Sequence, residues 1–145
     1  YEFREYDPSI TGKEAAPEPA ELVCCTDVLE HIEPIHLNAV LRDLKRVTKR
    51  KLFFNISTRP ARKILPDGRN AHLIIKTPDW WREKIAQHLD VLTWEVREGQ
   101  CMVYGEASPK GMFKKVTKRR KITPEMAAQC EVWKAECNKF PILVL

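Results

Sequence analysis

Glycine is scarce in this chain of 145 residues. Only five glycines are present, and no two of them are separated by a single residue. Loops built on a G-x-G pattern, which let backbone amides approach a dinucleotide or a phosphate group, are therefore missing from the sequence. No stretch approaches the roughly 18 apolar residues that a membrane-spanning helix needs. A membrane span is thus not expected.

Paired cysteines with metal-site spacing are also lacking. The five cysteines include adjacent Cys24 and Cys25 inside an apolar run, and no C-x-x-C pair occurs. An odd number of cysteines, two of them adjacent, is typical of reduced thiols in a cytoplasmic protein. Without C-x-x-C spacing, no structural zinc site is predicted, and no metal ligands are assigned.

Positive charge is concentrated in one short segment. The formal net charge is +5, yet residues 110–121 alone contribute seven lysines and arginines, without which the charge would be −2. Such a run is typical of a solvated loop, and the alternative is a contact with nucleic acid phosphates. The residues that would make this contact are Lys114, Lys115, Lys118, Arg119, Arg120 and Lys121.

The pattern of apolar residues alternates between strand-like and helix-like segments. Leu37, Leu41, Leu44 and Val47 recur at helical spacing, and Thr77 followed by Pro78 is typical of a helix start. An α/β open sheet with helices on its faces and a terminal antiparallel hairpin is therefore predicted. The expected strands are residues 1–6, 21–26, 51–57, 91–97 and 101–106, and the expected helices start near 37, 77 and 123.

A short motif carries a resemblance to a known family. The stretch from Leu22 to Ile32 reads as an apolar strand followed by D-V-L-E-H-I. It resembles the fourth strand and following turn of class I S-adenosylmethionine-dependent methyltransferases, and residues 51–57 resemble their fifth strand. Residues 64–81 are similar to a phage and bacterial methyltransferase-like subgroup. The resemblance covers about residues 1–108.

The resemblance implies a Rossmann-like sheet with strand order 3-2-1-4-5-7-6, mostly parallel, from which one strand is missing. The first strand of the family, with its glycine-rich loop, has no counterpart before Tyr1, and it should lie between the strands at residues 1–6 and 21–26. Three explanations are open. The chain is a piece of a longer protein, a partner or a second copy covers the gap, or residues 1–6 pair directly with 22–25.

The resemblance also assigns a cofactor, S-adenosylmethionine. Asp7, at the end of the expected second strand, would accept hydrogen bonds from the ribose hydroxyls, although an Asp-Pro sequence also ends a strand without any ligand. Asp27 would orient the methionine amino group or the acceptor, or it would simply cap the following turn. Cys25 and Thr26 would line the same wall through their backbone.

Polar residues near the D-V-L-E-H turn and in a long loop are the candidates for chemistry on the methyl acceptor. Glu30 and His31 are suited to proton transfer or to a structural hydrogen bond. The loop before residue 77 is longer than most, and long loops are often functional. The catalytic candidates are His31 and His72, and the substrate-binding candidates are Glu30, Arg59, Arg69, Asn70 and Trp80.

These observations give one leading hypothesis and two alternatives. The leading hypothesis is methyl transfer from S-adenosylmethionine to an unidentified acceptor by an incomplete methyltransferase-like domain at residues 1–109. A basic linker at 110–122 and a helix with an apolar tail at 123–145 would follow. The alternatives are a non-catalytic binding module derived from a methyltransferase, and a nucleic-acid-binding protein that uses residues 110–121.

Overall fold

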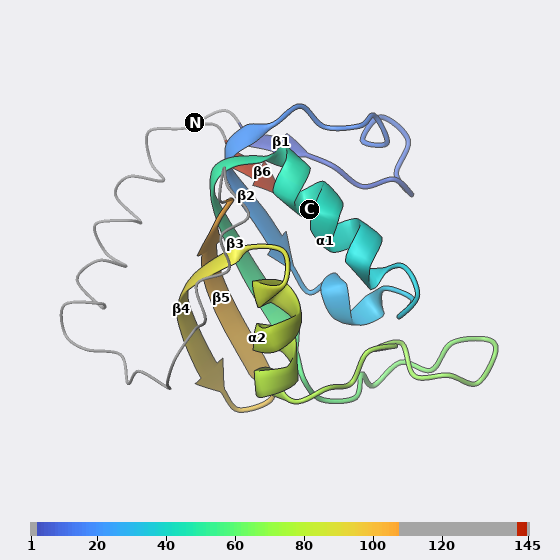
Figure 1. The fold of residues 1–145 in the computed structure, drawn as a ribbon. Helices are drawn as coiled ribbons and strands as arrows, with labels where there is room; N and C mark the ends of the chain where they lie inside the picture. Colours follow the sequence, from blue (N-terminus) through green and yellow to red (C-terminus); the bar gives the residue numbers. More distant parts are fainter. Residues whose placement is uncertain (1–2, 108–141, 145) are drawn as a thin grey trace.

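A computed structural model describes residues 3–107 and 142–144 as an α/β fold (Figure 1). Nine elements are assigned in these two ranges. They are β1 (Phe3–Glu5), β2 (Ala20–Thr26), the 3-10 helix η1 (Leu29–His31), α1 (Leu37–Val47), β3 (Thr48–Ser57), α2 (Pro78–Ala86), β4 (Asp90–Arg97), β5 (Gln100–Glu106) and β6 (Ile142–Val144). No helix within the described ranges has the length and apolar character to cross a membrane.

The strands form one mixed sheet with the order β1-β6-β2-β3-β5-β4. The four longer strands contain one parallel pair, β2 with β3, while β5 is antiparallel to both β3 and β4. The predicted terminal hairpin is therefore confirmed. Its two strands are joined at Glu98 and Gly99, where Gly99 adopts a φ of 72° that favours glycine.

The short strand β6 fills the position in which the sequence analysis expects a gap. Leu143 pairs in parallel with Arg4 of β1 on one side and with Val23 of β2 on the other. The expected gap between the strands at residues 1–6 and 21–26 is therefore wrong. Direct pairing of residues 1–6 with 22–25 is also wrong, because β6 lies between them. With both neighbouring edges paired to β6, the argument that a partner must cover them no longer applies.

Both helices of the described part pack on the same face of the sheet (Figure 1). Alternate residues of the strands point to this face, and they share one apolar core with the buried stripes of the helices. The core includes Val23, Leu52, Phe54, Ile56 and Val103 from the sheet, Leu37, Leu41, Leu44 and Val47 from α1, and Trp81 and Ile85 from α2. The predicted helical periodicity is thus confirmed for α1.

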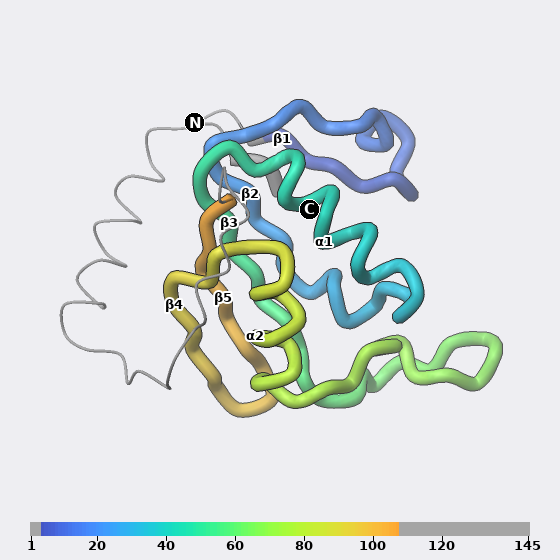
Figure 2. Tube along the Cα trace, in the orientation of Figure 1, coloured from blue at the N-terminus to red at the C-terminus, as the bar shows by residue number. Residues whose placement is uncertain are grey.

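The start of α2 follows the local sequence. Thr77 has extended backbone, and its side-chain oxygen accepts a hydrogen bond from the backbone N–H of Trp80, with Pro78 in the first helical position. The segment before it, between β3 and α2, runs out from the sheet and doubles back (Figure 2). The basic residues 110–121 and the helix expected from residue 123 lie outside the described residues.

Candidate functional site

The carboxyl ends of the parallel strands define the edge of the sheet that carries the candidate residues. Glu5 of β1, Val144 of β6 and Cys24 of β2 stand side by side, and Thr26 of β2 pairs with Asn55 of β3. The chain leaves β1 toward Asp7 and leaves β2 toward Asp27 and η1 at this edge. Open α/β sheets commonly bind their ligands there.

Glu30 is the buried acid of this edge. Its side chain has no solvent exposure, and its Oε1 accepts a hydrogen bond of 2.8 Å from the backbone N–H of Ser57 at the end of β3. Its other oxygen, Oε2, is buried without a hydrogen-bond partner. The backbone carbonyl of Glu30 also accepts from the N–H of Ile74. A buried carboxylate with one unpaired oxygen is costly and is usually explained by a missing ligand, water or ion.

Two histidines that are 41 positions apart in the sequence meet beside Glu30. The rings of His31 and His72 are edge to face, with centroids 4.8 Å apart. A ligand atom of each histidine and a carboxylate oxygen of Glu30 all lie within 4.8 Å of one another. The structure therefore brings together both histidines singled out in the sequence, and with them Glu30. We call these three residues the Glu30 cluster.

Backbone carbonyl groups fix the tautomer of both imidazole rings. Nδ1 of His31 lies 2.8 Å from the carbonyl oxygen of Ala71, and Nδ1 of His72 lies 2.6 Å from that of Arg59. A carbonyl oxygen only accepts hydrogen bonds, so both Nδ1 atoms must carry a proton. In the neutral rings each Nε2 therefore has a free lone pair. Both histidines are thus prepared to accept a proton or to bind a metal ion.

Two buried thiols lie near Glu30. Burial raises the pKa of the Cys25 thiol, and the charge of Glu30 raises it further. Burial, again followed by the charge of Glu30, raises the pKa of Cys101 to about 12. Both thiols are therefore protonated at neutral pH, and neither is a nucleophile or a thiolate ligand. The side chain of Cys25 belongs to the apolar core, which leaves its backbone as the part predicted to line the cofactor wall.

Asp27 lies at the end of β2 in an unusual backbone conformation. Its φ is +54°, which makes it the one non-glycine residue with positive φ in the described ranges. Asparagine and aspartate tolerate this region better than other side chains. The N–H of Asp27 donates to the carbonyl of Asn55, whose side-chain amide lies 3.5 Å from Oδ1 of Asp27. The carboxylate is exposed, and half-buried Thr26 precedes it.

Asp7 follows β1 and organises the turn that ends this strand. Its Oδ1 accepts hydrogen bonds from the backbone N–H and the hydroxyl of Ser9, at 2.8 and 2.6 Å. These bonds hold the pKa of the Asp7 carboxyl below its ordinary value. Asp7 therefore forms the turn that ends the strand, as an Asp-Pro sequence also predicts. Its carboxylate remains ionised at neutral pH.

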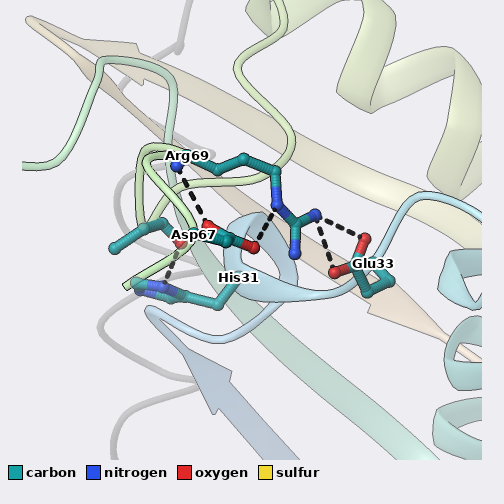
Figure 3. Close-up of polar contacts among 5 residues, drawn as sticks. His31, Glu33, Asp67 and Arg69 are labelled. Carbon is teal, nitrogen blue, oxygen red and sulfur yellow. Dashed lines mark hydrogen bonds and ion pairs between the residues drawn. The ribbon is translucent and has the colours of Figure 1, made fainter. Parts of the chain in front are cut away.

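Arg69 binds two acids of its own chain (Figure 3). Its Nε is 2.7 Å from Oδ2 of Asp67, and its guanidinium is 2.8 Å from Oε1 of Glu33. These contacts raise the pKa of Arg69 and hold the long loop against the segment after η1. In the structure Arg69 therefore has a role in holding the loop, and its place in a polar substrate wall stays a prediction.

Asn70 also serves the loop. Its Oδ1 accepts from the N–H groups of Ala61 and His72, and its Nδ2 donates to the carbonyl of Ala61. These bonds join the two arms of the loop and help to position His72, and the contact of Asn70 with a substrate stays a prediction. Arg59 contributes its carbonyl to His72, while its side chain lies against Gly99.

Trp80 stands apart from the Glu30 cluster. It is half-buried on α2, contacts the Trp81 ring edge to face at 5.2 Å, and lies 5.9 Å from the ammonium group of Lys76. These neighbours show Trp80 packed at the start of α2. No described contact joins it to either histidine.

Sequence reasoning missed the groups that position the cluster. They are the backbone N–H of Ser57 and the backbone carbonyls of Arg59 and Ala71. Backbone groups leave no side-chain signal, so nothing in the sequence could have identified them.

Comparison of the chain with protein-family models, with curated proteins and with solved structures found no match. The chemistry of the site is therefore the basis for its interpretation.

Proposed function

We propose that this chain forms the core of a methyltransferase domain with a Rossmann-like sheet, which transfers a methyl group from S-adenosylmethionine to an acceptor. The observation that carries the proposal is the position of β6. The resemblance in residues 22–32 implies the order 3-2-1-4-5-7-6. The described order β1-β6-β2-β3-β5-β4 agrees with its 2-1-4-5-7-6 part if β6 takes the place of the first strand.

The directions of the strands agree with this assignment as well. The pairs β1–β6, β6–β2 and β2–β3 are parallel, whereas β5 runs antiparallel between β3 and β4. A parallel sheet that ends in an antiparallel hairpin is what the resemblance implies. The carboxyl ends of the parallel strands then form the cofactor side of the domain.

Residues at this edge fit part of the cofactor. Asp27 offers an exposed carboxylate, and beside it Asn55 has a buried side-chain oxygen without a hydrogen-bond partner. Such acceptors suit the amino group of the methionine part. Asp7 remains ionised at the end of β1 and can accept from the ribose hydroxyls through the oxygen that Ser9 does not use. The backbone of Thr26 completes this wall.

The chemistry of the reaction leaves the protein two tasks. When bound, S-adenosylmethionine supplies a methyl group that its sulfonium already makes electrophilic. The chain must orient the acceptor in line with that methyl group, and it must accept the proton that the acceptor loses or stabilise the negative charge that this loss leaves. Glu30 and His31 follow β2 directly and His72 lies beside them, so the Glu30 cluster is the group at this edge that is suited to the second task. We therefore retain His31 and His72 as the residues that act on the acceptor.

Calorimetric titration of the full chain with S-adenosylmethionine tests the proposal. We expect one binding site, weakened about tenfold by Asp27→Asn, because this change removes a charge while asparagine keeps the positive φ. Glu21→Gln, at the opposite end of β2, is the matched control and should leave affinity unchanged. Absence of binding at millimolar cofactor would contradict the proposal and favour a non-catalytic module. The alternative of nucleic-acid binding rests on residues outside the described ranges.

A further inference from the structure

We infer that Glu30, His31 and His72 form a binding site for a single divalent transition-metal ion. This set contains two imidazoles and one carboxylate, whose ligand atoms lie within 4.8 Å of one another. Two histidines with one acid bind zinc in hydrolytic enzymes and non-haem iron(II) in oxygenases. The site does not depend on the proposed methyl transfer, since it is argued from these side chains alone.

The histidines have the outer hydrogen bonds that metal ligands require. Metal-binding histidines almost always donate their other ring N–H to a carbonyl or carboxylate, which fixes the tautomer and the ring orientation. His31 donates from Nδ1 to Ala71, and His72 donates from Nδ1 to Arg59. Each ring thus keeps Nε2 as a neutral donor atom. The side-chain Oδ1 of Asn70 accepts a hydrogen bond from the backbone N–H of His72 and so adds a further support.

The unpaired oxygen of Glu30 is an independent indication of a cation. The side chain is fully buried, Oε1 is bonded to Ser57, and Oε2 has no partner. A metal ion held by the two rings and bound also through Oε2 would give this oxygen the partner that it lacks. The cluster therefore has a carboxyl oxygen available on a side chain that the fold holds in place.

The geometry permits closure on an ion with little movement. With metal–nitrogen bonds of about 2.0–2.1 Å, ligand atoms at a tetrahedral centre stand about 3.3 Å apart. Ligand atoms separated by up to 4.8 Å must therefore approach by about 1.5 Å. His31 is exposed, so a small shift of its ring about the bond to Ala71 can supply this movement while Glu30 remains fixed. The exposure of His31 also leaves coordination positions open toward solvent.

The donor set selects the class of metal. Imidazole nitrogen suits zinc, iron, cobalt and nickel, whereas Mg²⁺ prefers oxygen ligands and keeps its waters. The buried thiols Cys25 and Cys101 are protonated and take no part. An open position on such an ion would bind an oxygen donor such as water or an acceptor hydroxyl and lower its pKa. Only this last use, the activation of a hydroxyl acceptor, rests on the proposed function.

Metal binding by the full chain tests the site directly. The protein is freed of metal with a chelator, transferred to metal-free buffer without S-adenosylmethionine, and titrated with Co²⁺ and Zn²⁺. We expect one ion per chain, Co²⁺ absorption bands without thiolate charge transfer, and no competition from millimolar Mg²⁺. His31→Gln and His72→Gln should each weaken binding by tenfold or more. His36→Gln, an exposed histidine outside the cluster, is the matched control and should bind like the unaltered chain.

Glu30→Gln is the third ligand variant and should also weaken binding by tenfold or more. Circular dichroism establishes that each variant is folded, and exposed His31 keeps the test decisive if a change at buried Glu30 prevents folding. Unchanged affinity in both histidine variants, or thiolate charge transfer in the cobalt spectrum, would overturn the inference. So would failure of the unaltered chain to bind Co²⁺ or Zn²⁺. Since cofactor is absent from this titration, its failure is distinct from failure of the proposed methyl transfer.

Discussion

The carboxylate of Glu30 accepts a hydrogen bond of 2.8 Å from the backbone N–H of Ser57, across 27 positions of sequence. This bond attaches η1 to the end of β3 and places Glu30 and His31 beside the start of the long loop. The other end of that loop brings His72 back to the same place, where its ring contacts the ring of His31. The site therefore depends on one buried acid.

Replacement of Glu30 tests its contribution to the stability of the fold. Glu30→Ala leaves the buried N–H of Ser57 without an acceptor and opens a cavity, so we expect the free energy of unfolding to fall by about 2–3 kcal/mol. Glu30→Gln keeps an oxygen for Ser57 and should lose less. Urea denaturation in the presence of a chelator measures both. Equal stability of the alanine and glutamine variants would show that the bond to Ser57 contributes nothing.

The raised pKa of the buried Cys101 thiol predicts a loss of stability at alkaline pH. Burial, followed by the charge of Glu30, raises its pKa from 9.0 to about 12, so the unfolded chain releases this proton at lower pH than the folded chain. Its contribution to stability is therefore complete below about pH 9 and is lost as pH rises through the interval to about 12. At about pH 10.5 the loss from this thiol is about 2 kcal/mol.

Cys101→Ala removes this titration. Urea denaturation of both proteins at about pH 8 and about pH 10.5 should show the smaller alkaline loss in the variant. The comparison is made within each protein, so other groups that titrate in this range contribute equally to both. An identical alkaline loss in the two proteins would contradict the assignment.

Removal of the Arg69 side chain should loosen the long loop without changing the stability of the whole fold. The ion pairs of Arg69 with Asp67 and Glu33 are on the surface, where solvent screening leaves such pairs with little effect on stability. Arg69→Ala should therefore change global stability little, yet amide hydrogen exchange in residues 61–72 should become faster because the loop loses its attachment to Glu33. Arg62→Ala, another arginine of the same loop, is the control. Unchanged exchange would show that other contacts hold the loop.

Leu143 tests the placement of β6. Its backbone pairs with Arg4 and Val23 on opposite sides, so Leu143→Pro removes an N–H from a strand with neighbours on both sides. We expect a loss of several kcal/mol in the free energy of unfolding, whereas Leu143→Ile should be tolerated. A proline variant as stable as the original chain would exclude β6 from the interior of the sheet.

Much of the fold follows from local signals in the sequence. The spacing of Leu37, Leu41 and Leu44 predicts α1, and Thr77 with Pro78 predicts the start of α2. The position of β6 was not predictable in this way. An apolar run at residues 140–145 is compatible with a strand, but pairing with Arg4 and Val23 is a contact across most of the chain. Sequence periodicity carries no information about such a contact.

The site was predictable only in its parts. Glu30, His31 and His72 are recognisable as chemically capable residues, but their meeting depends on carbonyl groups of Arg59 and Ala71. Arg69 and Asn70 are predicted in a substrate wall, and the structure shows that they bond to Asp67, Glu33 and Ala61 of their own chain. A polar loop residue that holds its own loop cannot be distinguished by sequence from one that binds a substrate.

The most direct test of the central claim, a cofactor site at the carboxyl edge of the parallel strands, is a chemical-shift titration. Amide signals of the isotope-labelled full chain are followed by NMR as S-adenosylmethionine is added. The proposal predicts saturable shifts at residues 7, 26, 27 and 55, with little change at residues 21 and 49–50 at the opposite edge. An unchanged spectrum at millimolar cofactor, or shifts centred on the opposite edge, would contradict it.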